Sequence, residues 1–176
     1  SFAVAEGEVF ALLGPNGAGK TTTVEILEGF RRADAGRVSV LGSDPARGER
    51  VFKERIGIVL QRCATEALLT VTEAMRRQAG YYPRPRPVSE VLDMMGLADR
   101  AGHVPDALSG GERQRVTIAR SLVNDPAIVW ADEPTGDLDS ATANDIMGLM
   151  QQLNREQMLT FVIVTHDLAS VFTALD

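Results

Sequence analysis

Residues 14–21 read Gly14-Pro15-Asn16-Gly17-Ala18-Gly19-Lys20-Thr21 and fit the pattern G-x-x-x-x-G-K-[ST] at every position. Glycines in such a loop let backbone N–H groups surround a phosphate without interference from side chains. The pattern requires a strand before it and a helix after it, and residues 9–13 (VFALL) and 21–30 (TTTVEILEGF) fit these two flanks. This phosphate loop therefore predicts a P-loop NTPase fold that binds a nucleotide.

The end of the phosphate loop carries the side chains expected to hold ATP and Mg²⁺. Lys20 offers a compact positive charge to the β- and γ-phosphates, so we also count it as catalytic. The hydroxyl of Thr21 is a candidate ligand for Mg²⁺. Thr22 follows in the first turn of the helix and completes the expected ATP site.

Apolar runs bounded by turn residues predict the other strands. They are residues 37–41, 56–60, 127–131 and 160–164, and several are apolar throughout, as in strands that are covered on both faces. Residues 21–30 and 140–157 have helical spacing of their apolar positions. Strands that alternate with helices indicate an α/β fold with a mostly parallel sheet flanked by helices.

The middle of the chain differs from this pattern. Residues 63–126 contain no convincing strand, and we predict that they form a helical subdomain inserted into a single domain of residues 1–176. Three prolines within residues 82–88 remove backbone donors and favour an extended path. A stiff connector is the preferred interpretation of this stretch, and a docking ligand for a proline-binding module is the alternative.

Composition narrows the classes of protein to consider. The chain has 176 residues, which suits one domain, and its one cysteine, Cys63, excludes an internal disulfide framework. The formal net charge is −6 without a basic run, which argues against nucleic acid as a partner. Because no apolar run reaches the roughly 18 residues needed to span a bilayer, we expect a cytoplasmic protein.

Acidic residues follow a second apolar strand. Asp132 and Glu133 come directly after residues 127–131, at the carboxyl edge where a parallel sheet binds ligands. We expect Asp132 to hold Mg²⁺ and Glu133 to orient and deprotonate the attacking water. His166 follows residues 160–164 at the same edge and is a candidate for polarising the γ-phosphate. Gln61 also ends a strand, but a single glutamine carries little weight without further support.

A second glycine-rich stretch, Ser109-Gly110-Gly111-Glu112, opens the helix that begins near residue 110. Ser109 and Glu112 fit a capping box, which accounts for these two residues. It does not account for two glycines at a helix start, where they cost stability. Because bare N–H groups at a helix start suit an anion, this glycine turn predicts close approach of a phosphate. Two copies arranged head to tail would let each glycine turn reach the γ-phosphate held by the other copy.

These motifs together resemble the nucleotide-binding domain of ATP-binding cassette (ABC) transporters. The phosphate loop resembles Walker A of that family, residues 127–133 its Walker B, and Leu108 with the glycine turn its signature, with Glu112 in place of glutamine. Gln61 falls at the position of the Q-loop glutamine, residues 136–139 at the D-loop, and His166 at the switch histidine. The motifs occur in the order of the family and cover nearly the whole chain.

The resemblance implies a function and partners. It implies an ATPase subunit in which two nucleotide-binding domains, identical or merely similar, enclose ATP between them and drive a membrane permease. The ATP ligands would include the phosphate loop, Thr22, the glycine turn and Asp139, and the ligands of Mg²⁺ would include Thr21, Gln61 and Asp132. The protein would lie on the inner face of the cell membrane through its permease.

Two departures from the family accompany the resemblance. The chain resembles a fragment that lacks end segments, and neither Phe2 nor Phe10 stands where the family places its adenine-stacking aromatic, so we expect weak ATP binding. In its first half, residues 21–48 and 80–88 are similar to daunorubicin-resistance exporters, whereas residues 108–140 are similar to lipoprotein-release and macrolide-export ATPases. Both halves favour export. A soluble ABC-type ATPase without a permease is the alternative, and a non-hydrolysing fragment is a weaker one.

Overall fold

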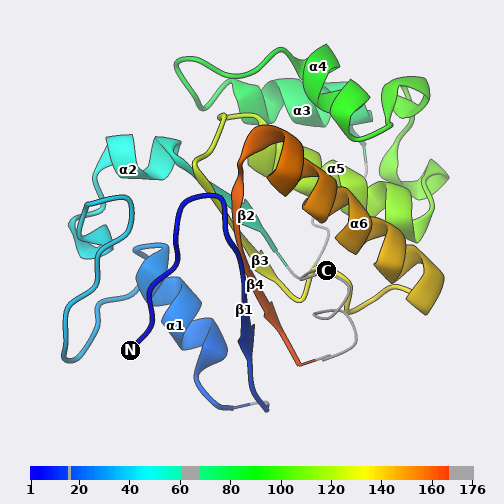
Figure 1. Ribbon diagram of the computed structural model, residues 1–176. Helices are drawn as coiled ribbons and strands as arrows, with labels where there is room; N and C mark the ends of the chain where they lie inside the picture. Colours follow the sequence, from blue (N-terminus) through cyan, green and yellow to red (C-terminus); the bar gives the residue numbers. More distant parts are fainter. Residues whose placement is uncertain (16, 61–67, 167–176) are drawn as a thin grey trace.

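The computed structural model describes residues 1–15, 17–60 and 68–166, and Figure 1 shows these as ribbon. At its centre is a four-stranded parallel sheet with the order β1-β4-β3-β2. The strands are β1 (Val9–Leu13), β2 (Ile56–Val59), β3 (Ile128–Asp132) and β4 (Thr160–Thr165). The predicted α/β class is confirmed, and four of the five predicted strands are present with ends that differ by one residue at most.

The two faces of the sheet are buried by different helices because successive side chains in a strand point to opposite faces. Phe161 and Ile163 of β4 belong to a large apolar cluster that also includes residues of α5 (Gly110–Leu122) and α6 (Ser140–Gln157). Val162 and Val164 of the same strand belong to a second cluster, with Val24 of α1 (Lys20–Leu27). Accordingly, α1 lies on one side of the sheet and α5 and α6 on the other (Figure 1).

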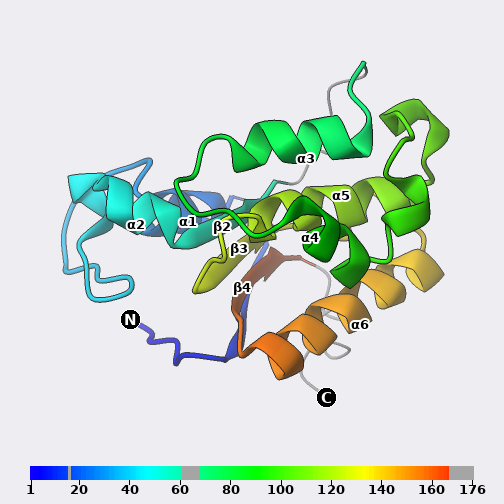
Figure 2. The same ribbon diagram turned by 90° about the horizontal axis from the view of Figure 1, so that it is seen from above.

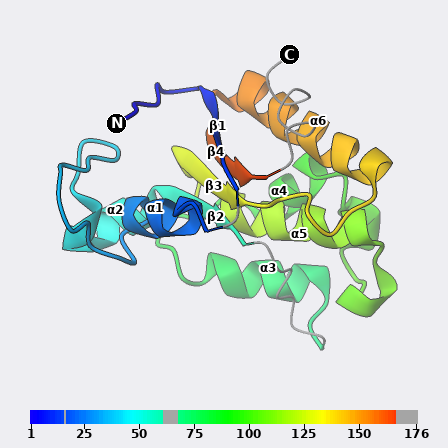
Figure 3. The same ribbon diagram turned by 90° about the horizontal axis from the view of Figure 1, so that it is seen from below.

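The remaining helices are short. They are α2 (Arg50–Glu54), α3 (Val71–Ala79) and α4 (Val88–Met94), with 3₁₀ turns at Pro45–Arg47, Ala98–Arg100 and Pro105–Ala107. Figures 2 and 3 show α5 between the sheet and α3. Among the described residues no helix is long and apolar enough to cross a membrane.

The sequence predicts a strand at residues 37–41, and this prediction is wrong. Only Val40 pairs, through an isolated bridge to Ser43, and Leu41 and Gly42 adopt positive φ angles of 52° and 78° that turn the chain back. The apolar alternation of this segment has no strand beside it among the described residues, and an extended segment is stable only when a neighbour accepts its backbone hydrogen bonds. The residues 37–41 are therefore a loop beside α1.

The described part of the middle segment contains helices and 3₁₀ turns and no strand, as predicted. Its apolar side chains, such as Met75 and Val91, join the same cluster as the α5 and α6 face of the sheet. A separate subdomain over residues 63–126 stays a prediction, and residues 61–67 lie outside the described residues.

Arg86 forms the hydrogen bonds that hold the proline-rich stretch, residues 82–88, against the ends of α5 and α6. Its backbone N–H donates to the carbonyl of Val123 at 2.7 Å, and its guanidinium pairs with Asp125 and donates to Gln157 Oε1 at 3.1 Å. These partners come from the end of α5 and the end of α6. The stretch is therefore a connector held at a defined place, which agrees with the preferred interpretation of its sequence.

We expect Arg86→Ala to lower the free energy of unfolding by about 1–2 kcal/mol, because charge-assisted hydrogen bonds are lost at a site where Asp125 is partly solvated. Urea unfolding measures the change. Arg84→Ala is the matched control, since Arg84 lies two residues earlier and is exposed. Equal stability of the two variants would contradict the role given to Arg86.

Candidate functional site

The phosphate loop takes its shape from two glycines with left-handed backbone conformations. Gly17 has φ 81° and Gly19 has φ 87°, angles that other residues rarely adopt. A Cβ atom at either position would meet nothing within 4 Å, so there is room for a side chain. Glycine is favoured here because of the backbone conformation alone. The loop is closed by a hydrogen bond from the N–H of Ala18 to the carbonyl of Pro15 at 3.2 Å. Asn16 lies outside the described residues.

Lys20 begins α1 directly after this loop. Its ammonium group donates to the carbonyls of Gly14 at 2.6 Å and Pro15 at 3.2 Å, which holds the charge over the loop. Gly19, the N-cap of α1, provides no side-chain cap, so the first N–H groups of the helix are not bound by a capping side chain. A helix start without a cap, next to a lysine, is suited to a phosphate group.

The predicted side chains converge on one pocket at the carboxyl edge of the sheet. It has a volume of about 350 Å³. Its lining residues are Gly17, Gly19, Lys20, Thr21, Thr22, Asp132, Glu133 and His166. These residues come from the segments after β1, β3 and β4, which are neighbours in the sheet. The strand order, which the sequence does not state, thus brings together residues that are more than 100 positions apart.

Glu133 is held in an unusual conformation by the end of β4. Its φ angle is 47°, and its N–H donates to the carbonyl of Val164 at 2.8 Å. The carboxylate accepts hydrogen bonds from the Thr165 hydroxyl at 3.0 Å and from the His166 N–H at 3.1 Å. Because a positive φ is uncommon outside glycine, this position is one where the surrounding structure determines the backbone. Thr165 is a supporting residue that sequence reasoning missed, although it stands beside His166.

Glu133 and His166 form a pair. The Nδ1 atom of His166 lies 2.7 Å from Glu133 Oε1, and the histidine side chain is 60% exposed whereas that of Glu133 is 13% exposed. The glutamate therefore lies deeper and can orient the imidazole towards the open side of the pocket.

Asp132, the predicted ligand of Mg²⁺, ends β3. Burial raises the pKa of its carboxyl group, the nearby Glu133 adds to the rise, and Lys20 opposes it. Asp132 and Thr21 line the same pocket and offer carboxylate and hydroxyl oxygens, the ligand type that Mg²⁺ prefers. No cluster of three or more His, Cys, Asp or Glu side chains suited to a metal occurs among the described residues. Mg²⁺ would therefore need phosphate oxygens and water as its other ligands, which fits its usual binding with nucleotides.

The glycine turn lies outside this pocket, at the start of α5. The predicted capping box is present: the Glu112 N–H donates to Ser109 Oγ at 3.1 Å, and the Ser109 N–H donates to Glu112 Oε2 at 2.7 Å. Ser109 is exposed, and Gly110 and Glu112 are half-buried, so the turn is open to another molecule.

Packing within the protein accounts for one of the two glycines. A Cβ atom at Gly111 would come within 2.7 Å of the methyl carbon of Thr142 in α6, which is closer than real contacts allow. At Gly110 the nearest atom would be a Leu138 methyl carbon at 3.4 Å, an ordinary contact. Gly111 is therefore packed closely against α6, and the approach of a phosphate to either glycine stays a prediction.

The predicted roles of two further residues, Asp139 and Gln61, stay predictions. Asp139 is the N-cap of α6, and its carboxylate accepts hydrogen bonds from the Thr142 N–H at 3.0 Å and the Thr142 hydroxyl at 2.7 Å. These bonds lower the pKa of Asp139. A contact of Asp139 with nucleotide stays a prediction. Gln61 lies outside the described residues, so its predicted roles at the γ-phosphate and Mg²⁺ also stay predictions.

The aromatic residues near the N-terminus are also placed. Phe2 stacks on Phe10 with ring centroids 5.0 Å apart and an interplanar angle of 12°. Neither residue is among those that line the pocket of the phosphate loop, and the expected lack of an adenine-stacking aromatic stays a prediction.

The arrangement of these motifs on one sheet edge agrees with the match to known proteins. The family model described as "ABC transporter" matches residues 1–136. The chain belongs to the ABC transporter family. It is an α/β ATPase domain with the P-loop NTPase fold.

Three ABC proteins illustrate the range of its relatives. The lipoprotein-releasing system ATP-binding protein LolD 1 of Rhodopirellula baltica is 41% identical over 93% of this chain and 76% of its own length. The methionine import ATP-binding protein MetN 2 of Salmonella choleraesuis is 37% identical over 100% of this chain and 55% of its own length. A dimeric structure of the ATP-binding cassette MJ0796 in a post-hydrolysis state, bound to ADP and Pi, has a TM-score of 0.81 with 33% identity. The match extends over 98% of this chain and over 80% of the MJ0796 chain.

Proposed function

We propose that this ABC domain is the ATPase subunit of an exporter, and that ATP closes two copies head to tail on a membrane permease. One observation carries the proposal. The phosphate loop, both acids and His166 line one pocket, whereas the glycine turn is exposed at the start of α5 and lies outside that pocket. A second copy can therefore supply the glycine turn that the first copy cannot bring to its own nucleotide. The dimeric cassette MJ0796 supports this arrangement.

The pocket residues divide the work of hydrolysis. Lys20 has three ammonium donors, two of which are bound to the loop, so one is available for a β- or γ-phosphate oxygen. Thr21 and Asp132 would hold Mg²⁺, which would neutralise the charge that develops on the phosphate oxygens. Glu133 would accept the proton of the attacking water, and His166, oriented by Glu133, would lie beside the γ-phosphate.

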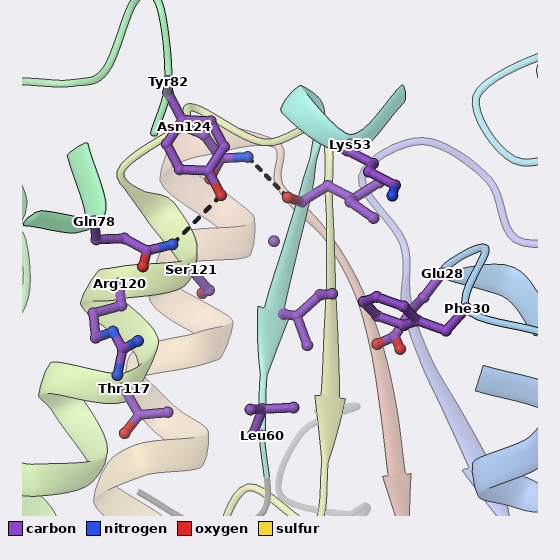
Figure 4. Close-up of a pocket in the computed structure, with 13 residues that line it drawn as sticks. Glu28, Phe30, Lys53, Leu60, Gln78, Tyr82, Thr117, Arg120, Ser121 and Asn124 are labelled. Atoms are coloured by element: carbon purple, nitrogen blue, oxygen red, sulfur yellow. Dashed lines mark hydrogen bonds between the residues drawn. The ribbon is translucent and has the colours of Figure 1, made fainter. Parts of the chain in front are cut away.

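A groove on another side of the protein is the proposed docking place of the permease. It has a volume of about 250 Å³ and lies between the end of α1, strand β2 and the helices α3 and α5 (Figure 4). Phe30 and Leu60 line it and are 67% and 58% exposed. Large apolar side chains that remain exposed beside a groove are typical of an interaction site. Figure 4 shows Glu28 and Phe30 on one side of β2 and Gln78 and Tyr82 on the other.

Glu28 in this groove gives the isolated protein a pH-dependent stability. The residue is 7% exposed, and burial, with smaller contributions from Asp132 and Glu25, raises its pKa from 4.5 to about 7. The folded protein then keeps a proton that the unfolded chain releases between these pH values. The contribution of Glu28 to the free energy of unfolding is therefore fully present below pH 4.5. It is lost as the pH rises from 4.5 through about 7.

We expect Glu28→Gln to raise the free energy of unfolding at pH 8 by up to about 3 kcal/mol and to flatten its pH dependence between pH 5 and 8. Urea unfolding at several pH values measures both effects. Asp145→Asn, an exposed change on α6, is the control and should leave the slope of the wild type. A slope that persists in Glu28→Gln would show that another group causes it.

Export is the finer part of the proposal. The similarity of residues 108–140 to lipoprotein-release and macrolide-export ATPases supports it, and the relative LolD 1 has a name of that type. The relative MetN 2 is named for import, so the family alone leaves the direction open. The mosaic of two export subfamilies stays a prediction.

Purification of the full-length protein from membranes tests the proposal. We expect a polytopic membrane protein to co-purify in a fixed ratio and ATP turnover to rise when both are reconstituted in lipid. The same purification from cells that express Lys20→Ala should retain the membrane protein without turnover. Recovery of ribosomes or other soluble partners in its place would favour the alternative of an ABC ATPase without a permease.

A further inference from the structure

Glu112 places a negative charge at the glycine turn. Two hydrogen bonds lower the pKa of Glu112 to about 2: the bond from the Ser109 N–H has the larger effect and the bond from Arg100 the next. The carboxylate is therefore ionised at neutral pH. It is the third residue of α5, beside the N–H groups of the helix start. In the proposed function this turn receives the γ-phosphate of a second copy. Two negative groups would then meet at the same helix start, and like charges across an interface oppose association.

Arg100 is positioned to cancel that charge. Its Nε donates to Glu112 Oε1 at 2.7 Å, while the other carboxylate oxygen of Glu112 accepts from the Ser109 N–H. The ion pair is partly shielded, since the side chains of Arg100 and Glu112 are 42% and 27% exposed. The carboxylate is thus turned back onto its own protein by two donors.

The local structure brings Arg100 to this place from a different element. Arg100 ends the 3₁₀ turn Ala98–Arg100, and its N–H donates to the carbonyl of Leu97, which is fully buried. The first two arginines after Glu112 in α5 donate to other groups: Arg113 donates to the carbonyl of Leu108 at 2.6 Å and Arg115 to that of Met95 at 3.2 Å. Arg100 is therefore the cation that pairs with Glu112.

We propose that Arg100 is a positioning residue for ATP-driven closure, which holds and neutralises Glu112 so that the glycine turn can accept the γ-phosphate of a second copy. The inference rests on the proposed function, because it requires that the glycine turn faces the nucleotide of another subunit. It also revises the predicted role of Glu112, whose carboxylate is occupied by Arg100 and Ser109 and does not serve as a direct ligand of ATP.

The chain offers a charge-specific test. Glutamine at position 112 can keep the capping box, since that motif accepts Glu or Gln, and it removes only the charge. Arg100→Ala, Glu112→Gln and the double variant are made in full-length protein that carries Glu133→Gln, and the dimer dissociation constant with ATP is measured by analytical ultracentrifugation. Arg100→Lys keeps the charge, and Arg84→Ala removes an arginine far from the turn.

We expect Arg100→Ala to weaken the dimer about tenfold at low salt, because both nucleotide sites of a symmetric dimer lose the neutralising charge. High salt should reduce this effect. Glu112→Gln should restore the dimer of Arg100→Ala to within about twofold of Glu112→Gln alone, and Arg100→Lys should stay close to the parent. This rescue would not occur if Arg100 only supported the fold of the loop.

Four outcomes would count against the inference. A dimer unaffected by Arg100→Ala, or a double variant as weak as Arg100→Ala, overturns the role of Arg100 and leaves the proposed function standing. A weakening of similar size in Arg84→Ala would assign the effect to net charge and overturn it equally. A parent protein that stays monomeric with ATP overturns the proposed function and this inference with it.

Discussion

Glu133→Gln should lower ATP turnover by about 100- to 10,000-fold, the range expected for loss of a general base. Glutamine has nearly the same shape and can accept a hydrogen bond from the Thr165 hydroxyl, but it cannot take the proton of the attacking water. Binding of ATP should be retained, because the phosphate loop and Lys20 are untouched. The ATP-bound dimer should therefore accumulate, since the step that reopens it is blocked.

Two measurements in full-length protein check this expectation. A single-turnover assay with radiolabelled ATP reports the chemical step, and size-exclusion chromatography with ATP reports the dimer. Asp145→Asn, which changes an exposed acid on α6, should behave as the wild type in both. Turnover of Glu133→Gln within a few-fold of the wild type would remove Glu133 from the role of base.

Two inactive variants should restore activity when they are mixed. Lys20→Ala removes the phosphate-binding charge from a protomer, and Ser109→Arg blocks the exposed glycine turn that the protomer offers to its neighbour. In a head-to-tail dimer, each mixed pair keeps one site with an intact Lys20 from one copy and an intact Ser109 from the other. Equal mixing without ATP, followed by ATP, should recover about a quarter of the wild-type turnover, since half of the dimers are mixed and each has one of two sites.

The separate variants supply the controls. Each alone should turn over no ATP, while Ser109→Arg should still bind ATP as a monomer with the affinity of the wild type. A mixture of Lys20→Ala with Glu133→Gln should recover nothing, because both changes leave each protomer without a competent pocket of its own. If the mixture of Lys20→Ala with Ser109→Arg stays inactive while mixed dimers are detected, reciprocity between the copies is wrong.

The sequence predicts the catalytic edge of this protein well because its chemistry is local. The phosphate loop needs positive φ angles that only glycine adopts readily, so Gly17 and Gly19 mark the loop by their residue type alone. Strands β3 and β4 are largely apolar and end in polar residues, which places Asp132 and His166 at the carboxyl edge of the sheet. The capping box of α5 is likewise contained within four consecutive residues.

Features that depend on distant partners were not predictable in this way. Residues 37–41 have the composition of a strand, but strand formation needs a neighbour, and the described residues supply none. The pair Arg100–Glu112 joins residues twelve positions apart through a loop whose path has no sequence signal. Glu28 stands in a regular helical pattern, and only the packing of β2 and α5 around it shows that its carboxyl group is buried.

The contact between Gly111 and Thr142 has a consequence for how two bound nucleotides influence each other. It joins the first turn of α5 to the first turn of α6, and the segment that leads from Glu133 to α6 is short. In the proposed dimer, this close contact would link the turn that serves the ATP of one copy to the segment that carries Glu133 at the ATP of the other. A larger residue at position 111 would have to displace Thr142, so we expect it to disturb both sites.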